Sequence, residues 1–481
     1  MKYIIYTVFI FLFVVECHSQ YTLPQDVVES INKRIEIGLN PSIAIGVINK
    51  TGTYYFNFGK TKENGTPVNE HTIYEIGSIT KTFTAILLAQ QEIEGKLKID
   101  DPIKNYLPAE VKVPQKGKTE ITFKHLSNHT SGLPNIPTNF SPFNIDNPYV
   151  HYTVNQMYSF LSTYELPREI GISFEYSNVA QGLLGHILAL NAKCSYEELM
   201  LKVIANPLGM KETKIHFDEK MKKNLAIPHR DGEEVSNWDI PTFAGAGAIR
   251  SSTFDMLKFL NTNMELKKTV LTNAIKKTHE VTFEKPNKTR IGLGWLIVKG
   301  AKGDIICHDG ETGGYKAFVG FVKEDSIGVV LFTNSAENIH DIAFHLLDSS
   351  KSLQQVKKSL SIEIRRIINK KDVHKLIEFF NDVKQKNNLH EYNFNETSLN
   401  FLAYSFVEKN IEVALVIFKF IIELYPTSYS VYDSYGEALL KNGQKELAIE
   451  NYKKSIELNP ENINGIKILK ELGVEISTTK K

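Results

Sequence analysis

The Ser-x-x-Lys motif, which places a hydroxyl nucleophile beside an amine, occurs three times, at Ser30, Ser78 and Ser477. Ser477 lies in a polar tail and Ser30 in an amphipathic helical pattern, whereas Ser78 follows Gly77 and opens a strongly apolar helical pattern. Lys81 then lies one turn on, where a partly desolvated amine can lose its proton and activate the hydroxyl. We therefore predict Ser78 and Lys81 as a catalytic pair. The alternative is an ordinary Ser N-cap with a solvent-reaching Lys.

A Tyr-x-Asn motif, Tyr176 to Asn178, directly precedes a second apolar helical segment. At such a loop–helix junction the Tyr176 phenol can shuttle protons and the Asn178 amide can position a substrate carbonyl. Lys81 and Tyr176 can titrate as one coupled system, so the sequence leaves open which of them is the acylation base. A second Tyr-x-Asn, at 55–57, falls within a predicted strand and is attributed to chance.

The segment HDGETGG, residues 308–314, is predicted to line one wall of the cleft at the end of a strand. Its glycines allow close backbone approach. We take His308, Gly310 and Glu311 as candidate substrate-binding residues.

The three motifs, in this order, resemble those of the serine β-lactamase and penicillin-binding superfamily, in its class C-like branch of carboxypeptidases and esterases. The resemblance covers about 25–345, and the stretches ITFKHLSNHTSGLP, NPLGMKET and AGAGAIRSSTFDMLKFL support it. It implies that Ser78 is acylated, that Lys81 and Tyr176 share proton transfers, and that the backbone N–H groups of Ser78 and Glu311 form an oxyanion hole. Each oxyanion donor typically contributes about 3–4 kcal/mol.

The sequence departs from the family pattern where penicillin-hydrolysing members carry Lys-Thr-Gly. Here His308 and Asp309 precede Gly310. A neutral imidazole near a carboxylate binds an anionic substrate tail poorly, whereas a protonated His308 would bind it better, and Asp309 can instead point away from the cleft. We therefore expect an acyl-enzyme mechanism on an ester, a D-amino peptide or amide, or a β-lactam, with β-lactams the least favoured.

The order of predicted helices and strands around these residues indicates an α+β domain. We expect a β-lactamase/transpeptidase-like antiparallel sheet flanked by helices. Helical spacing covers residues 22–36, 78–95 and 254–264. Strands are predicted at 43–49, 54–58, 293–299, 315–322 and 328–333, so both ends of the domain complete the sheet.

The C-terminal part of the chain aligns with itself at an offset of 34 residues, the tetratricopeptide period. Ala414 falls on Ala448 and Phe418 on Tyr452. We expect all-α tetratricopeptide-like repeats at 394–475, with a helical connector or degenerate repeat at 349–393 after a hydrolase domain at 20–348. A generic helical hairpin is the alternative. Such repeats would offer a concave surface to a protein or peptide partner.

The charge balance bears on binding partners, and the N-terminal residues bear on cellular location. The 56 basic residues nearly cancel the 55 acidic ones, which gives no reason to expect nucleic-acid binding. Lys2 and the apolar run 3–15 predict a signal peptide, residues 1–19, and hence a periplasmic or secreted protein with no membrane helix after cleavage; lipidation at Cys17 is the alternative. The later cysteines, Cys194 and Cys307, cannot form a disulfide framework.

Two other functional classes deserve comparison. His125 and His129 have metal-ligand spacing, but Leu126 stands where a zinc protease has its Glu, so we expect no metal and no cofactor. A non-catalytic envelope interaction module acting through the repeats is the second alternative. Retention of all three motifs argues against it.

Overall fold

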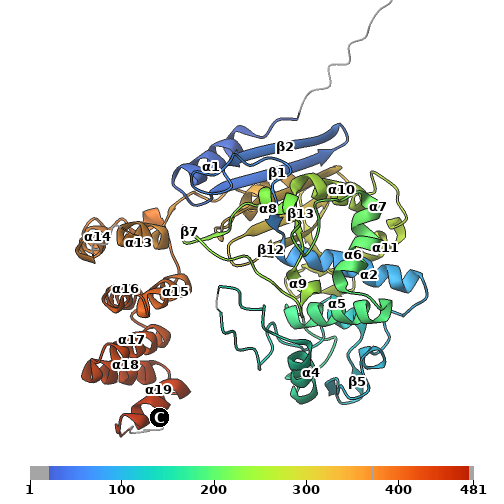
Figure 1. Cartoon of the computed structure of the whole chain (residues 1–481). Coiled ribbons are helices and arrows are strands. Elements are labelled where there is room, and N and C mark those ends of the chain that lie inside the picture. The colour runs from blue at the N-terminus through green and yellow to red at the C-terminus, as the bar shows by residue number, and fades with distance from the viewer. Residues whose placement is uncertain (1–20, 145, 370–372, 476–481) are drawn as a thin grey trace, which may run out of the picture.

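An eight-stranded antiparallel sheet forms the centre of the N-terminal body, which we define as residues 21–348 (Figure 1). The computed structural model describes residues 21–144, 146–369 and 373–475. The strand order is β2-β1-β14-β13-β12-β11-β10-β9. The strands are β1 (Ser42–Asn49), β2 (Gly52–Gly59), β9 (Phe283–Glu284), β10 (Arg290–Ile291), β11 (Leu296–Lys299), β12 (Asp304–Glu311), β13 (Lys316–Val322) and β14 (Ile327–Thr333).

The sheet joins the two ends of the body, as the sequence predicts. The N-terminal strand β1 pairs with β14, with Ile43 opposite Thr333 and Ile48 opposite Gly328. The expected strands and helices are present with small shifts at their ends, and β12, which carries the His308 motif, lies inside the sheet between β11 and β13. The α+β prediction is therefore confirmed.

Both faces of the sheet are covered by helices. In β1, the alternate residues Ile43, Ile45 and Val47 enter a core with α1 (Gln25–Glu36) and α12 (His340–Leu347). Ala44 and Ile48 enter the larger core on the opposite face, which includes residues of α2 (Thr80–Ile93) and α10 (Thr253–Asn263). A strand buried on both sides reads as a continuous apolar run, which explains why β1 shows no polar alternation.

The larger core holds the helices that carry the motifs. The helix α5 (Asn178–Ala192) packs against the short α9 (Ala244–Gly247), where a Cβ added to Gly185 would lie 2.7 Å from Cα of Gly245. The other short elements of the body are α3 (Phe123–Ser127), α4 (Val154–Thr163), α6 (Tyr196–Met200), α7 (Asn206–Leu208), α8 (Glu219–Lys223), α11 (Thr272–Thr278), β3 (Tyr74–Glu75), β4 (Gln115–Lys116), β5 (Thr119–Glu120), β6 (His229–Arg230), β7 (Glu233–Glu234) and β8 (Arg250–Ser251).

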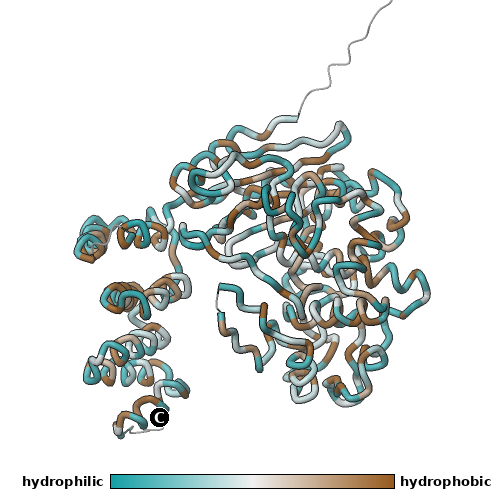
Figure 2. Tube along the Cα trace, in the orientation of Figure 1, coloured by the Kyte–Doolittle hydropathy of each residue, from teal (hydrophilic) through white to brown (hydrophobic). Residues whose placement is uncertain are grey.

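Beside the body stands a column of helices, α13 to α19, that runs away from the sheet toward the C-terminus (Figure 1). They are α13 (Leu360–Asn369), α14 (Val373–Gln385), α15 (Glu396–Val407), α16 (Ile411–Leu424), α17 (Tyr429–Lys441), α18 (Lys445–Leu458) and α19 (Ile463–Glu471), with a small β15 (Lys358–Ser359) and β16 (Tyr392–Asn393) pair near the start. Apolar stretches recur along the column as they do within the body (Figure 2).

The core of the column extends further toward the N-terminus than residue 394. Leu360 of α13 and Phe380 of α14 share one apolar cluster with Leu399 of α15 and Phe418 of α16. The helices α13 and α14 therefore pack as part of the column. The C-terminal region is helical as expected, and its assignment to tetratricopeptide repeats stays a prediction.

Export and membrane association depend partly on residues that are not described. The predicted signal peptide, residues 1–19, and Cys17 lie outside the described residues. In the part of the chain that is described, none of the helices has the length and apolar character needed to cross a bilayer.

Candidate active site

Ser78 lies in a single 3₁₀ turn, Gly77–Ile79, that leads directly into α2. Gly77 has φ of +49°, and a Cβ there would lie 2.7 Å from the backbone nitrogen of Glu311. Only glycine combines this left-handed backbone with so close an approach. The turn therefore presents Ser78, which is partly exposed, against the end of β12.

The backbone of β12 contacts the Ser78 turn directly at Gly310. A Cβ at Gly310 would lie 2.0 Å from the carbonyl oxygen of Ile76 and 3.2 Å from the backbone nitrogen of Ser78. The two peptide groups that the family resemblance implies for an oxyanion hole, those of Ser78 and Glu311, are thus next to each other. The Glu311 side chain is exposed and is paired with Lys316.

The Lys81 ammonium is buried and makes three contacts. Its Nζ lies 2.8 Å from Ser78 Oγ, 2.8 Å from Asn178 Oδ1 and 2.7 Å from the Ala246 carbonyl oxygen. An amide oxygen and a carbonyl oxygen can only accept, so they take two N–H bonds. In the neutral amine, the remaining lone pair therefore faces the Ser78 hydroxyl.

Burial changes the protonation of Lys81. Desolvation lowers its pKa from 10.5 to about 7, and the charge of Asp309 opposes this shift. A substantial fraction of Lys81 is therefore neutral near pH 7 and can accept a proton. The pKa of the Tyr176 phenol moves the other way, because burial raises it while a hydrogen bond with Ser78 lowers it. Tyr176 is therefore a protonated phenol at neutral pH.

His129, to which the sequence gave no role in the reaction, supports the Tyr176 segment. Its ring stacks on Tyr176 with centroids 4.6 Å apart and planes 24° apart. Its Nδ1 accepts the backbone N–H of Ser177 at 3.1 Å. Burial, together with Lys81 and His308, keeps the pKa of His129 well below its usual value, so the ring remains a neutral acceptor.

His308 faces Tyr176, with ring centroids 6.4 Å apart. Its Nδ1 lies 2.5 Å from the Asp309 backbone carbonyl, which can only accept, so Nδ1 carries the proton and Nε2 is left as an acceptor. Burial lowers the pKa of His308 to about 4, against the opposing charge of Asp309. The site thus has a neutral acceptor where the family pattern has a lysine cation.

Asp309 lies on the other face of the sheet. Ile306 of β12 belongs to the core that holds the Ser78 helix, whereas Cys307 belongs to the core with α1 and α12. Strand alternation therefore directs His308 toward Ser78 and Asp309, which is exposed, away from it. Asp309 influences Lys81 through its field rather than by contact.

A neutral Lys81 and a cationic His308 are favoured in different pH ranges. Lys81 is neutral mainly above about pH 7, while His308 is a cation only below about pH 4. Whenever the amine can act as a base, the imidazole carries no charge. At pH 7 the His308 imidazole is therefore neutral.

All seven candidate residues lie around one site: Ser78, Lys81, Tyr176, Asn178, His308, Gly310 and Glu311. The sequence missed the Ala246 carbonyl and His129 as neighbours of Lys81 and Tyr176. Ala246 belongs to AGAGA, whose small residues favour a close backbone approach, and His129 belongs to a stretch that supports the family resemblance; neither signal identifies the contact. The other Tyr-x-Asn lies in β2, at the edge of the sheet.

The chain that carries this buried lysine, serine and tyrosine is similar to known proteins. The Beta-lactamase family model matches residues 31–346, well over half of the chain. The chain belongs to the Beta-lactamase family. Residues 349–475, which include the helical column, lie beyond the part that matches. As a member, the protein is a serine hydrolase.

Individual members of the family agree with this placement. A "Beta-lactamase" of Pseudomonas fluorescens is 29% identical over 329 residues, 61% of this chain and 88% of that protein. The "D-alanyl-D-alanine-carboxypeptidase/endopeptidase AmpH" of Escherichia coli K12 is 26% identical over 330 residues, 63% and 84% of the two chains.

Solved structures show the same fold. The Yersinia pestis "Beta-lactamase/D-alanine Carboxypeptidase" complexed with citrate has a TM-score of 0.57 at 25% identity, covering 64% of this chain and 92% of its own. A class C beta-lactamase from Rhodobacter sphaeroides has a TM-score of 0.58 at 23% identity, covering 67% and 100%.

The two histidines with metal-ligand spacing have separate partners. His125 Nδ1 contacts Thr122 at the start of α3, while His129 contacts Ser177. Among the described residues, no group of three His, Cys, Asp or Glu side chains is placed to hold a metal ion.

Proposed function

We propose that this protein hydrolyses esters or D-amino peptides and amides through an acyl-enzyme on Ser78, and that β-lactams are poor substrates. The observation that carries the proposal is the three-fold contact of the buried Lys81 amine, which has two fixed acceptors and leaves its lone pair toward Ser78. This is the geometry an amine needs in order to remove the hydroxyl proton.

The proposed proton path begins at Lys81. Of the two candidate bases, Lys81 has its pKa lowered to about 7, while burial raises the pKa of Tyr176. Lys81 therefore takes the Ser78 proton as Oγ attacks the carbonyl carbon, and the N–H groups of Ser78 and Glu311 stabilise the oxyanion. The Tyr176 phenol donates its proton to the leaving group and regains one from Lys81. Water then attacks the acyl-enzyme by the reverse transfers.

The proposed substrate preference follows from the opposed titrations of Lys81 and His308. Carboxylate recognition depends strongly on charge-assisted hydrogen bonds, and His308 offers none in the active form. A leaving group that is uncharged, or that donates to Nε2 of His308, fits better. Esters and amides with neutral ends meet this condition.

Two further parts of the proposal concern location and the column. We infer export to the periplasm or outside the cell from the basic residue and apolar run at the N-terminus. The rival function, an interaction module acting through the repeats, receives support from the separate apolar core of the column. The two functions are compatible in one chain.

A substrate panel tests the proposal. Initial rates are measured on an activated ester, a D-alanyl thioester with an amide end, the same thioester with a carboxylate end, and a chromogenic cephalosporin. We expect the first two to give the highest kcat/KM and the cephalosporin the lowest. A cephalosporin turned over faster than the neutral thioester would contradict the proposed preference.

A further inference from the structure

Two adjoining pockets lie between the body and the helical column, and the first is lined by Glu311, whose backbone lies beside the Ser78 turn. The first, about 780 Å³, begins at Glu311 and Trp238 and reaches Phe394 and Phe401 beside and on α15. The second, about 680 Å³, continues along α15 as far as Lys409. Arg230, Asp231 and Phe401 line both, so we call the two together the distal groove. Each volume is in the range of ordinary ligand sites.

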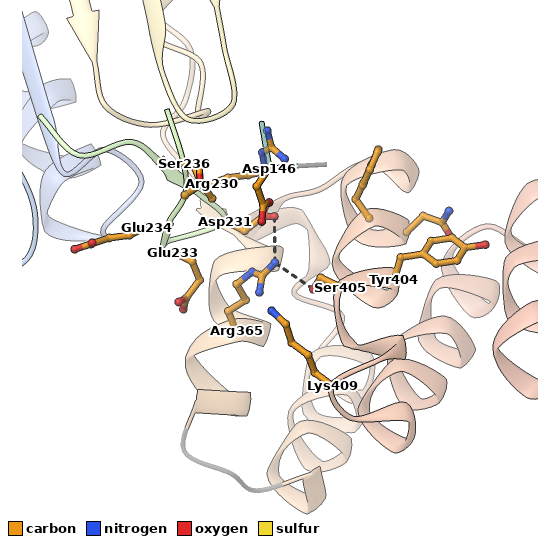
Figure 3. Close-up of a pocket in the computed structure, with 13 residues that line it drawn as sticks. Asp146, Arg230, Asp231, Glu233, Glu234, Ser236, Arg365, Tyr404, Ser405 and Lys409 are labelled. Atoms are coloured by element: carbon orange, nitrogen blue, oxygen red, sulfur yellow. Dashed lines mark hydrogen bonds and ion pairs between the residues drawn. The ribbon is translucent and has the colours of Figure 1, made fainter. Parts of the chain in front are cut away.

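The column is fastened to the body where it forms the wall of the distal groove. Arg365 of α13 lies 4.0 Å from Asp231 and donates to Ser405 Oγ of α15 at 3.3 Å, so it joins the body to α15 (Figure 3). Asn369 Nδ2 donates to Glu233 at 2.6 Å, and Arg366 donates to the Ile37 carbonyl at 3.0 Å. These contacts join α13 to separate segments of the body, and Arg365 also links α13 to α15.

The first pocket combines aromatic rings with uncharged polar groups. Tyr149 and Trp238 line the body side, and Phe401 lines the column side. Phe401 is 54% exposed, whereas its neighbours Leu399 and Leu402 are fully buried in the column core. Phe401 therefore adds nothing to that core and is free to contact a ligand.

The remaining polar lining of the first pocket suits amide groups. Around α15 it includes Asn393, Asn395, Thr397 and Ser398, which can donate or accept. Of the charged side chains that line the first pocket, Glu311 is paired with Lys316, and Asp231 lies 4.0 Å from Arg365. Arg230 donates to the Gly313 carbonyl, and burial raises the pKa of Glu337. This lining matches an extended chain of amide and apolar groups better than a polyanion.

We propose that α15, with Phe401 at its centre, forms a distal subsite that binds the peptide extension of the acyl substrate. The inference rests on the proposed acyl transfer at Ser78, because the groove begins at Glu311 beside the oxyanion hole. The column then selects long peptide-type substrates over short ones, and it does so through binding rather than through the chemical step.

The test uses two thioesters with the same reacting D-alanyl unit, one bearing a short acetyl cap and one extended by four uncharged amino acids. Full-length wild type is compared with Phe401→Ser and with Thr397→Trp, which fills the groove from an exposed position. Leu447→Ser is the matched control, since Leu447 is 46% exposed on α18 and does not line the groove.

We expect wild type to prefer the long substrate, and Phe401→Ser and Thr397→Trp each to lower its kcat/KM about tenfold, mainly through KM. The short substrate and the Leu447→Ser control should be unchanged. Equal long-to-short ratios in wild type and Phe401→Ser, or an equal loss in Leu447→Ser, would overturn the inference while leaving acyl transfer intact. No turnover of the short substrate by wild type would instead reject the proposed function, and the distal subsite with it.

Discussion

Replacing His308 by lysine should change which end groups the enzyme accepts. With a pKa of about 4, His308 is protonated in roughly one molecule in a thousand at pH 7. His308→Lys places a cation on the same face of β12, beside Tyr176. A hydrogen bond to a charged group contributes about 1.5–3 kcal/mol, which corresponds to roughly 10- to 100-fold in kcat/KM.

The assay compares two thioesters that differ only in a carboxylate or a primary amide at the leaving-group end. We expect His308→Lys to raise the carboxylate-to-amide ratio of kcat/KM by about 10- to 100-fold over wild type, and His308→Gln, a neutral control, to leave the ratio unchanged. An unchanged ratio in a His308→Lys enzyme that still turns over the amide would contradict the expected role of the charge at position 308. It would mean that the residue 308 side chain does not meet the leaving group.

Three further predictions concern the groups around Ser78. The neutral Lys81 amine is the active form, and its pKa is about 7. For an uncharged ester, kcat/KM should therefore rise about tenfold per pH unit below pH 7 and level off above it. A rate that is flat between about pH 5 and 7 would contradict this. Gly310→Ala places a Cβ 2.0 Å from the Ile76 carbonyl oxygen. Acylation, measured by the burst of leaving group, should therefore slow by roughly 100-fold or more. A burst at the wild-type rate would contradict this. His129→Phe keeps the stacked ring but leaves the Ser177 N–H without its acceptor. The free energy of unfolding in urea should therefore fall by about 1–3 kcal/mol. An unchanged unfolding midpoint would show that this hydrogen bond contributes nothing.

The sequence predicts the sheet and the nucleophile helix well, because their signals are local. Apolar runs such as 43–49 and the helical spacing after Ser78 reflect burial that each segment must have in any fold. The strands predicted at both ends of the domain indicate that the two ends complete one sheet, but not the register in which β1 pairs with β14 across 280 or more residues. Periodicity alone contains no such long-range pairing.

The sequence could not predict contacts made by the backbone or across the fold. The Ala246 carbonyl that accepts from Lys81 has no side-chain signal, and the stacking of His129 on Tyr176 joins segments 47 residues apart in the chain. The direction of Asp309, left open by the sequence, is set by the register of β12 between its two neighbours. The packing of α13 and α14 into the column likewise depends on contacts of Leu360 and Phe380 with residues of α15 and α16.

Acylation of Ser78 can be observed by intact-mass analysis. Wild type and Ser78→Ala are exposed to an activated ester, a D-alanyl peptide mimic and a penicillin, and the mass of each protein is measured over time. We expect one covalent adduct on wild type, formed fastest with the neutral reagents, and none on Ser78→Ala. A folded wild type that gains no adduct from any reagent, or a Ser78→Ala variant that is labelled equally, would contradict it.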